Sequence, residues 1–168
     1  PTPETDCNAM DDDNDSLIDE DACPCRSANW NGHSYVFCDT NQNSWSYARG
    51  ACQAFGYELA AINSEEENTW LTTKARPEGV EHGWWIGLYR DSGQGPDKYK
   101  WSNGDTSTYR NWGAGEPNNK GSGWSFDFER CAEFNYYPPG PKIIGEWNDR
   151  ACLGGLAEPQ RGWICESP

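Results

Sequence analysis

Two short motifs bring oxygen-bearing side chains close together in the sequence. Glu116 and Asn118 are separated by one proline, and further along the chain Asn148 and Asp149 are adjacent, directly after a tryptophan. An ionised carboxylate offers only acceptors, whereas a side-chain amide offers a carbonyl oxygen and an NH2 donor. Hard cations such as Ca2+ take roughly six to eight oxygen ligands in a flexible geometry. The two motifs therefore supply most of a Ca2+ shell, which a pair of ligand hydroxyl groups would complete.

The N-terminal end carries a separate pattern of acids. Residues 1–25 hold nine carboxylates and no Lys or Arg. Cys7 and Cys23 bracket an Asp-rich run with the spacing of a Ca2+-binding loop, but a serine and an alanine stand where an EF-hand requires glycine and glutamate. The segment more closely resembles the Asp-rich, cysteine-flanked calcium repeats of secreted proteins, and an acidic linker is the alternative. Its ligands would be Asp11, Asp13, Asp15, Leu17 (through its backbone carbonyl) and Asp19.

The eight cysteines and the net charge limit the class of protein. Their number is even, no spacing matches a zinc module, and Cys23 and Cys25 are too close for a redox Cys-x-x-Cys motif. Disulfides are therefore favoured, and with them an oxidising, extracellular location, either secreted or at a cell surface. The net charge of −14 argues against nucleic acid and anionic membranes as partners. No apolar run is long enough for a membrane span, and the absence of an initial Met fits a mature or trimmed form.

The elements that would position these residues fall into two helices followed by strands. Ser44 can cap a helix that ends at Gly56, and Ser64 and Glu67 form a capping box for a second helix. A loop over about 102–129 is long for a compact domain, and loops of this length are usually functional or disordered. Its aromatic residues Trp112, Trp124 and Phe126 favour an ordered, functional loop. The chain is thus predicted to be α+β, with segment 1–24 ahead of a domain over 25–168. Strands are predicted at 33–38, 58–62, 84–89, 99–101, 131–134, 143–147 and 162–165.

The order of several motifs resembles the C-type lectin-like domain, over roughly residues 25–168. The resemblance implies a C-type lectin fold with two helices, small antiparallel sheets and a long calcium-binding loop, stapled by disulfides. It pairs Cys52 with Cys165, Cys131 with Cys152 and Cys25 with Cys38, which leaves Cys7 for Cys23. The motifs are Trp85-Ile86-Gly87-Leu88, Tyr109-Arg110-Asn111-Trp112, Glu116-Pro117-Asn118, Glu129-Arg130-Cys131 and Trp147-Asn148-Asp149-Arg150-Ala151-Cys152.

The resemblance also implies a ligand set and a cis Glu116–Pro117 peptide bond. An apparent insertion precedes Glu129, so Asp127 is an alternative to it. Within this insertion, Trp124 either packs the loop against the domain or stacks on a sugar. The family often carries a further Ca2+ ion, but with Asn119 and Asp91 as the candidate ligands we do not expect it here. The implied ligands of the metal, which also bind the sugar, are Glu116, Asn118, Glu129, Asn148 and Asp149.

The function implied by the resemblance is Ca2+-dependent binding of vicinal sugar hydroxyl groups. The Glu-Pro-Asn order accompanies mannose, glucose, N-acetylglucosamine and fucose rather than galactose. One shallow site binds weakly, so oligomerisation or tandem display is expected. The alternative is a lectin-like fold with structural calcium, used for protein recognition, adhesion or ice binding. An enzyme is not predicted, because the clustered acids are better explained as metal ligands and His33 as a structural residue.

Overall fold

The computed structural model describes residues 25–42, 44–75, 83–91, 93, 95–120, 129–134, 145–153 and 161–168. The Asp-rich segment with its predicted Cys7–Cys23 disulfide lies outside the described residues, and so do Trp124 and Asp127.

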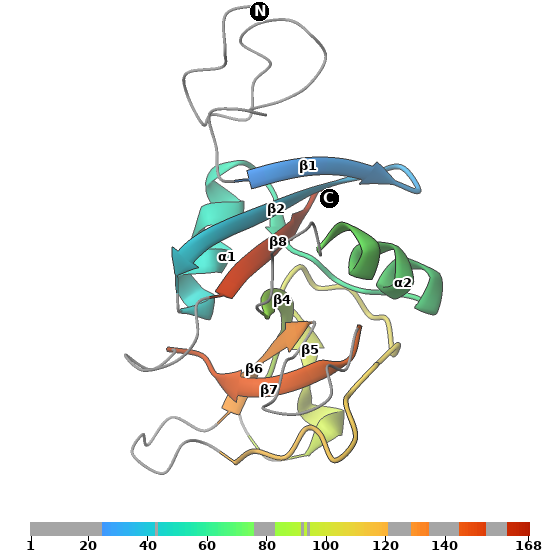
Figure 1. Cartoon of the computed structure of the whole chain (residues 1–168). Helices are drawn as coiled ribbons and strands as arrows, with labels where there is room; N and C mark the ends of the chain where they lie inside the picture. Colours follow the sequence, from blue (N-terminus) through green and yellow to red (C-terminus); the bar gives the residue numbers. More distant parts are fainter. Residues whose placement is uncertain are drawn as a thin grey trace, which may run out of the picture.

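Two helices and eight strands form the described part of the chain (Figure 1), which confirms the α+β prediction. The helices are α1 (Trp45–Ala54) and α2 (Glu65–Lys74), and a single 3-10 turn, η1, covers Pro96–Lys98. The strands are β1 (Cys25–Trp30), β2 (His33–Gln42), β3 (Glu58–Leu59), β4 (Trp84–Tyr89), β5 (Lys100–Trp101), β6 (Glu129–Phe134), β7 (Trp147–Ala151) and β8 (Arg161–Glu166).

The strands join in one connected sheet rather than in several small ones. Its order is β1-β2-β8-β4-β6-β7, with β3 on β8 and β5 on β4. Among the described pairings, β4 and β8 run parallel and the others antiparallel. Figure 1 shows both helices beside β1, β2 and β8, whereas β5, β6 and β7 lie at the other end with the long loop. The helices thus lie at the end of the domain that holds the C-terminus, and the long loop lies at the opposite end (Figure 1).

Both helices begin where the sequence predicts. The hydroxyl of Ser44 accepts from the backbone N–H of Tyr47 at 3.1 Å, and that of Ser64 accepts from Glu67 at 3.1 Å. The expected return bond of a capping box differs, because the Glu67 carboxylate accepts from the N–H of Asn63 at 2.7 Å instead of from Ser64. Glu67 points inward and is 2% exposed, so it is part of a buried network.

Several strands differ from the prediction. The predicted strand 58–62 is only Glu58–Leu59, and the predicted strand 33–38 continues to Gln42. β1 was not expected, yet Asn31 and Gly32 both have positive φ (48° and 89°) and form the two-residue turn of a β1–β2 hairpin. The predicted strand 143–147 is wrong in its bounds, because β7 starts at Trp147 and continues to Ala151. Its polar residues are buried against β6, and a search for alternating apolar residues does not detect such a strand.

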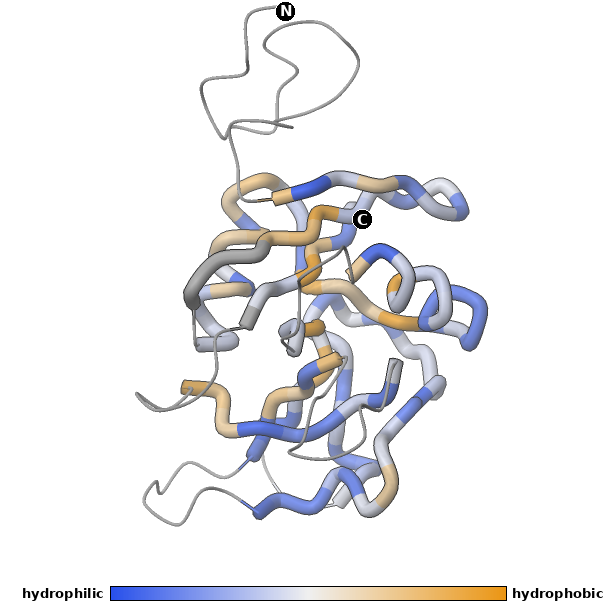
Figure 2. The backbone as a smooth tube through the Cα atoms, in the orientation of Figure 1, coloured by the Kyte–Doolittle hydropathy of each residue, from blue (hydrophilic) through white to orange (hydrophobic). Residues whose placement is uncertain are grey.

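Aromatic rings hold the start of β7 in the core. Trp147 is fully buried, and its ring meets those of Trp101, Tyr109 and Trp112 edge to face at 5.7, 5.7 and 5.9 Å. Such pairs each contribute about 0.5–1.5 kcal/mol beyond the buried area. Figure 2 shows hydrophilic residues along β7 and the described part of the long loop, and two of them, Asn148 and Asp149, are buried directly after Trp147.

Three of the predicted disulfides are present. Cys25–Cys38 joins β1 to β2, Cys52–Cys165 joins α1 to β8, and Cys131–Cys152 joins β6 to the end of β7. The third bridge fixes the two strands that carry the acids of the long-loop end. No helix in the described ranges is long and apolar enough to cross a membrane.

Candidate functional site

The Glu-Pro-Asn loop and β7 meet at Asn118. The Glu116–Pro117 peptide bond is cis, as predicted. The N–H of Asn118 donates both to Glu116 Oε2 at 3.0 Å and to Asp149 Oδ1 at 2.9 Å. The Asn118 Nδ2 donates to Glu116 Oε1 at 2.8 Å. Three of the five predicted ligands are therefore in direct contact.

Asp149 is the most deeply buried acid of this group. Asp149 is 0% exposed, although it lies on β7, a strand that consists mostly of polar residues. Besides the bond from Asn118, its Oδ2 accepts from the N–H of Asn119 at 3.0 Å and from the Tyr99 hydroxyl at 3.1 Å. These donors hold the loop after Pro117 against β7.

Glu129, at the start of β6, has a different environment. Its side chain is 5% exposed, and its Oε2 is buried without a hydrogen-bond partner in the part of the chain that the structure describes. Burial raises the pKa of Glu129 to about 7, with the charges of Asp149 and Glu116 adding to this effect and that of Arg150 opposing it. Burial also raises the pKa of Glu116, as do its hydrogen bond with Asp149 and the charge of Asp149. Three carboxyl groups thus share a small, partly dehydrated space.

Asn148 has a hydrogen-bond partner that is not one of the predicted ligands. Its Nδ2 donates to Glu133 Oε1 at 3.0 Å across the β6–β7 pair, and both side chains are nearly fully buried. Since its NH2 group has this partner, the carbonyl oxygen of Asn148 is the atom left for a cation. Glu133 was missed in the sequence, although its place two residues after Cys131 puts both on the same face of β6.

Arg90 and Tyr99 are further members of the site that the sequence did not reveal. The Arg90 guanidinium donates to Asn119 Oδ1, to the Gly93 carbonyl oxygen and, at 2.9 Å, to the Glu129 carbonyl oxygen. Asn119 therefore faces an arginine, whereas Asp91, the other residue considered for a further ion, pairs with Lys100. A charged residue directly after the buried strand β4 is the one sequence signal that pointed to Arg90.

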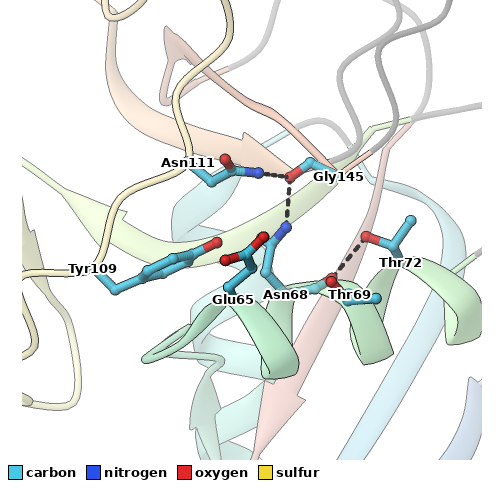
Figure 3. Close-up of a pocket in the computed structure, with 7 residues that line it drawn as sticks. All are labelled: Glu65, Asn68, Thr69, Thr72, Tyr109, Asn111 and Gly145. Carbon is cyan, nitrogen blue, oxygen red and sulfur yellow. Dashed lines mark hydrogen bonds between the residues drawn. The ribbon is translucent and has the colours of Figure 1, made fainter.

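A network behind β7 fixes Trp147 and with it the two residues that follow. Figure 3 shows Asn68 and Asn111 converging on the carbonyl oxygen of Gly145, to which their Nδ2 atoms donate at 2.9 and 2.7 Å. The Trp147 Nε1 donates to Asn68 Oδ1 at 2.8 Å, and the Trp147 N–H donates to the Asn111 carbonyl oxygen at 2.8 Å. A hollow of about 440 Å³ lies over this network, between α2 and Tyr109.

The donor set fits a hard cation. In the described ranges no group of three or more His, Cys, Asp or Glu side chains is arranged to hold a metal alone, and the amide group of Asn118 lies beside Glu116. Glu129 Oε2 lacks a donor, and the crowding of Glu116, Glu129 and Asp149 raises pKa values, as expected where a positive charge would relieve repulsion. Carboxylate and amide oxygens without sulfur or imidazole ligands are typical of Ca2+ rather than of Zn2+ or Cu2+.

Comparisons with known proteins give one consistent result. Human chondrolectin is 34% identical over 125 residues, which cover 65% of this chain and 43% of chondrolectin. The perlucin-like protein of Mytilus galloprovincialis is 30% identical over 150 residues, which cover 85% of this chain and 81% of that protein. Among solved structures, the carbohydrate-recognition domain of cow CD23, determined in the presence of a GlcNAc2Man3 oligosaccharide, is 28% identical with a TM-score of 0.65. That match covers 83% of this chain and 91% of the CD23 chain.

The family model described as "Lectin C-type domain" matches residues 41–167, which include both helices and every predicted ligand of the loop site. With its fold, its three disulfides and this match, the chain belongs to the C-type lectin domain family.

Proposed function

We propose that this domain binds carbohydrates in a Ca2+-dependent manner at the end formed by the Glu-Pro-Asn loop, β6 and β7. The observation that carries this proposal is the excess of acceptors over donors among Glu116, Glu129 and Asp149, with one buried oxygen of Glu129 left without a partner. Asn118 and Asn148 add amide oxygens to the set. A cation that neutralises these acids explains why a fold would keep three carboxyl groups so close together.

The residues of the site would act on a sugar in a defined way. When bound, Ca2+ supplies a positive charge that attracts the oxygens of two vicinal hydroxyl groups. Glu116 and Glu129 accept hydrogen bonds from those hydroxyl groups, while the NH2 groups of Asn118 and Asn148 donate to their oxygens. In the present structure these NH2 groups donate to Glu116 and Glu133, so a sugar would replace internal hydrogen bonds with equivalent ones.

The donor and acceptor order supports mannose, glucose, N-acetylglucosamine and fucose as the ligand class. Hydrogen bonds to charged groups contribute only about 1.5–3 kcal/mol each, so binding to a single sugar is weak. Homo-oligomers or tandem copies would raise the avidity for a glycoconjugate. The three disulfides fit an oxidising environment, and the proposed location is extracellular, either secreted or on a cell surface. A second Ca2+ ion in the loop of Asp11, Asp13, Asp15, Leu17 and Asp19 is a further part of this proposal.

A second candidate is recognition of a protein or of ice, with calcium in a structural role. One observation favours it: both ends of the Asn118 amide have internal partners, because its Oδ1 accepts from the N–H of Lys120 at 2.7 Å and its Nδ2 donates to Glu116. A loop satisfied in this way can present its surface to a partner without a sugar. Bond breaking belongs to neither candidate.

Isothermal titration calorimetry with mannose, fucose and galactose, in Ca2+ and again in EDTA, separates the two candidates. We expect Ca2+-dependent heat with mannose or fucose and little with galactose. The variant Glu116→Gln with Asn118→Asp should reverse that preference, because it exchanges an acceptor for a donor at position 116 and a donor for an acceptor at position 118. Absence of heat with every sugar, while Ca2+ still raises the melting temperature, would favour the second candidate.

A further inference from the structure

Arg90 is a buried positive charge inside the candidate calcium site. It follows β4 directly, and its side chain is 4% exposed. Removing a guanidinium from water costs much free energy unless its N–H groups find acceptors. A charge retained in such a place needs an explanation, since an uncharged side chain would avoid this cost.

The acceptors of Arg90 come from three separate segments. One is the Gly93 carbonyl oxygen in the turn after β4, one is Asn119 Oδ1 after the Glu-Pro-Asn motif, and one is the Glu129 carbonyl oxygen at the start of β6. All three are neutral oxygens of the kind that hard cations also bind. Arg90 thus occupies oxygens that would otherwise be available to an ion.

Tyr99 connects this arginine to the acids. Its hydroxyl oxygen lies 3.1 Å from Asp149 Oδ2 and 3.1 Å from the Glu129 carbonyl oxygen, and Arg90 Nε lies 3.4 Å from it. The guanidinium carbon also lies 5.8 Å from the centre of the Tyr99 ring. The positive charge of Arg90 therefore lies next to Asn119 and the start of β6, and the Tyr99 hydroxyl connects it to Asp149.

We propose that Arg90 is a built-in cation of the calcium loop, a positioning residue that assembles the loop before Ca2+ binds and restricts this end of the domain to one Ca2+ ion. The inference rests on the proposed function. The hydrogen bonds of Arg90 come from within the protein, so they hold Asn119 and the start of β6 without a second ion. Ca2+ should then bind to the loop without cooperativity, because no second ion is needed to order Asn119 and the start of β6.

The chain offers a matched control in Arg110. Its guanidinium also donates to backbone carbonyl oxygens of the long-loop region, those of Ser107, Tyr109 and Tyr99, and it lies 5.3 Å from the Trp101 ring. It has no hydrogen bond to Asn119 or Glu129 among the contacts of the described residues. Arg110→Gln therefore measures the effect of losing a part-buried guanidinium that does not contact Asn119 or Glu129. Arg90→Gln measures the effect of losing the hydrogen bonds to those two residues.

The first experiment measures Ca2+ binding by calorimetry and amide hydrogen exchange in EDTA, on the full chain at temperatures where each variant is folded. For Arg90→Gln we expect Ca2+ affinity about ten- to a hundredfold lower, as for loss of other groups that orient ligands. We also expect faster exchange at the Asn118 and Asn119 amides, which donate to Asp149. Arg90→Lys should recover part of both effects, and Arg110→Gln should change neither.

The second experiment counts ions. Arg90→Gln combined with Asn119→Asp frees the oxygens around Arg90 and adds a carboxylate, so this variant should bind one more Ca2+ ion than the parent chain. If Arg90→Gln itself fails to fold, Asn119→Gly, which keeps the positive φ of 53°, removes one acceptor and should shift affinity and exchange in the same direction by a smaller factor.

The proposal is overturned if Arg90→Gln matches Arg110→Gln in both affinity and amide exchange, or if the double variant gains no ion. Failure of the proposed function has a different signature. In that case Glu129→Gln would bind as many Ca2+ ions as the parent chain, while the exchange experiment in EDTA would still show whether Arg90 positions the loop.

Discussion

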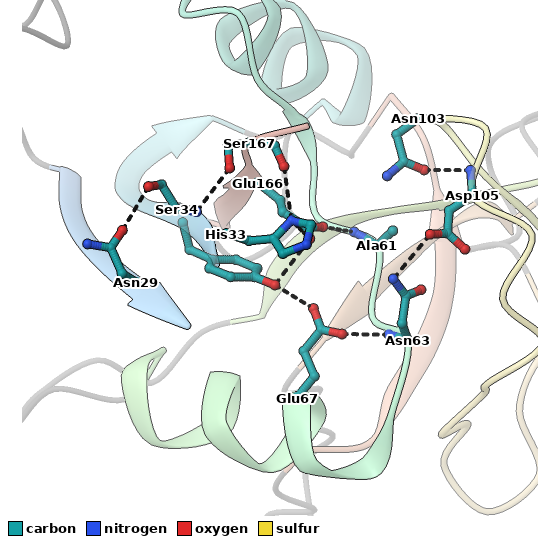
Figure 4. Close-up of polar contacts among 11 residues, drawn as sticks. Asn29, His33, Ser34, Ala61, Asn63, Glu67, Asn103, Asp105, Glu166 and Ser167 are labelled. Carbon is teal, nitrogen blue, oxygen red and sulfur yellow. Dashed lines mark hydrogen bonds and ion pairs between the residues drawn. The ribbon is translucent and has the colours of Figure 1, made fainter. Parts of the chain in front are cut away.

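Two buried groups of carboxyl side chains lie at opposite ends of this domain, and their hydrogen-bond donors differ. At the end of the domain near the C-terminus, Glu67 accepts from the Tyr35 hydroxyl at 2.8 Å and from the Asn63 N–H at 2.7 Å. Glu166 accepts from the Ala61 N–H at 2.9 Å, and Figure 4 shows these two acids reaching different parts of the segment that leads from β3 to α2. The His33 Nδ1 lies 3.1 Å from Glu166 Oε1.

At the loop end, the donors do not reach every carboxyl oxygen. Both oxygens of Asp149 accept hydrogen bonds, from Asn118, Asn119 and Tyr99, but Glu129 Oε2 has no donor among the described residues. The titration of the two groups does not separate them, since burial raises the pKa of both Glu129 and Glu166 to about 7. The carboxyl oxygen without a donor does separate them. In our account, the group of Glu67 and Glu166 is complete within the protein, and the group at the loop end is completed by a cation.

The largest expected effect comes from removing the carboxylate of Glu129, whose Oε2 has no donor among the described residues. Glu129→Gln should lower Ca2+ affinity at the loop at least about a hundredfold, equivalent to about 2.7 kcal/mol, because a charged ligand is lost. In EDTA the same variant should be at least as stable as the parent chain, since it relieves the crowding with Glu116 and Asp149. Calorimetry with Ca2+ and urea unfolding in EDTA measure the two effects. Lower stability in EDTA would contradict the idea that these acids repel one another.

The matched substitution at the other end should act in the opposite way. Glu166→Gln places an NH2 group where the Ala61 N–H or the Tyr35 hydroxyl needs an acceptor, which costs about 1–3 kcal/mol. The loss should be equal in Ca2+ and in EDTA, and the Ca2+ affinity should not change. Urea unfolding under both conditions tests this, and a loss that appears only in Ca2+ would argue against two independent groups.

A pH series sharpens the comparison. Each raised pKa means that the folded protein binds a proton more tightly than the unfolded chain, whose glutamates have a pKa of about 4.5. These groups therefore stabilise the ion-free protein at low pH, and their contribution is lost as pH rises from about 4.5 through about 7.

Glu129→Gln and Glu166→Gln should each flatten this part of the profile in EDTA. Added Ca2+ should restore stability most strongly above pH 7, because ligand carboxylates must be ionised. Unfolding curves at a series of pH values measure this, and an unchanged slope in both variants would exclude our assignment of the titrating groups.

The smallest effect is expected behind β7. Trp147→Phe keeps most of the ring contacts but removes the Nε1 donor to Asn68 Oδ1, which costs on the order of 1 kcal/mol. Because Asn148 and Asp149 follow Trp147, Ca2+ affinity should fall a few fold. Thermal unfolding and Ca2+ titration check both values. An unchanged affinity would mean that the disulfide Cys131–Cys152 and the β6 pairing position the ligands without this bond.

The sequence predicted the features of the molecule that depend on residues close to one another in the chain. Ser44 and Ser64 announce helix starts, and the Glu-Pro-Asn motif places Glu116 and Asn118 together because only one residue separates them. The hairpin turn at Asn31 and Gly32 was also readable, since Asn-Gly is a strong signal for a two-residue turn, and it was overlooked.

Other features arise only when distant segments meet. Arg90 contacts residues 29 and 39 positions further along the chain, and apart from its place directly after β4 no local pattern distinguishes it from a surface arginine. The polar residues of β7 are buried because β6 and the loop cover them, whereas alternation rules assume that buried strand positions are apolar. Sites built from buried polar groups are therefore where inference from the sequence is weakest.

The most direct test of the central claim is a Ca2+ titration of the full chain and of Glu129→Gln near pH 7, each by calorimetry in two buffers with different heats of ionisation. Our account predicts that the parent chain binds one more Ca2+ ion than the variant. It also predicts that this additional ion releases protons, since a carboxyl group with a pKa of about 7 must ionise to bind it. Equal stoichiometry and equal proton release in the two proteins would contradict it.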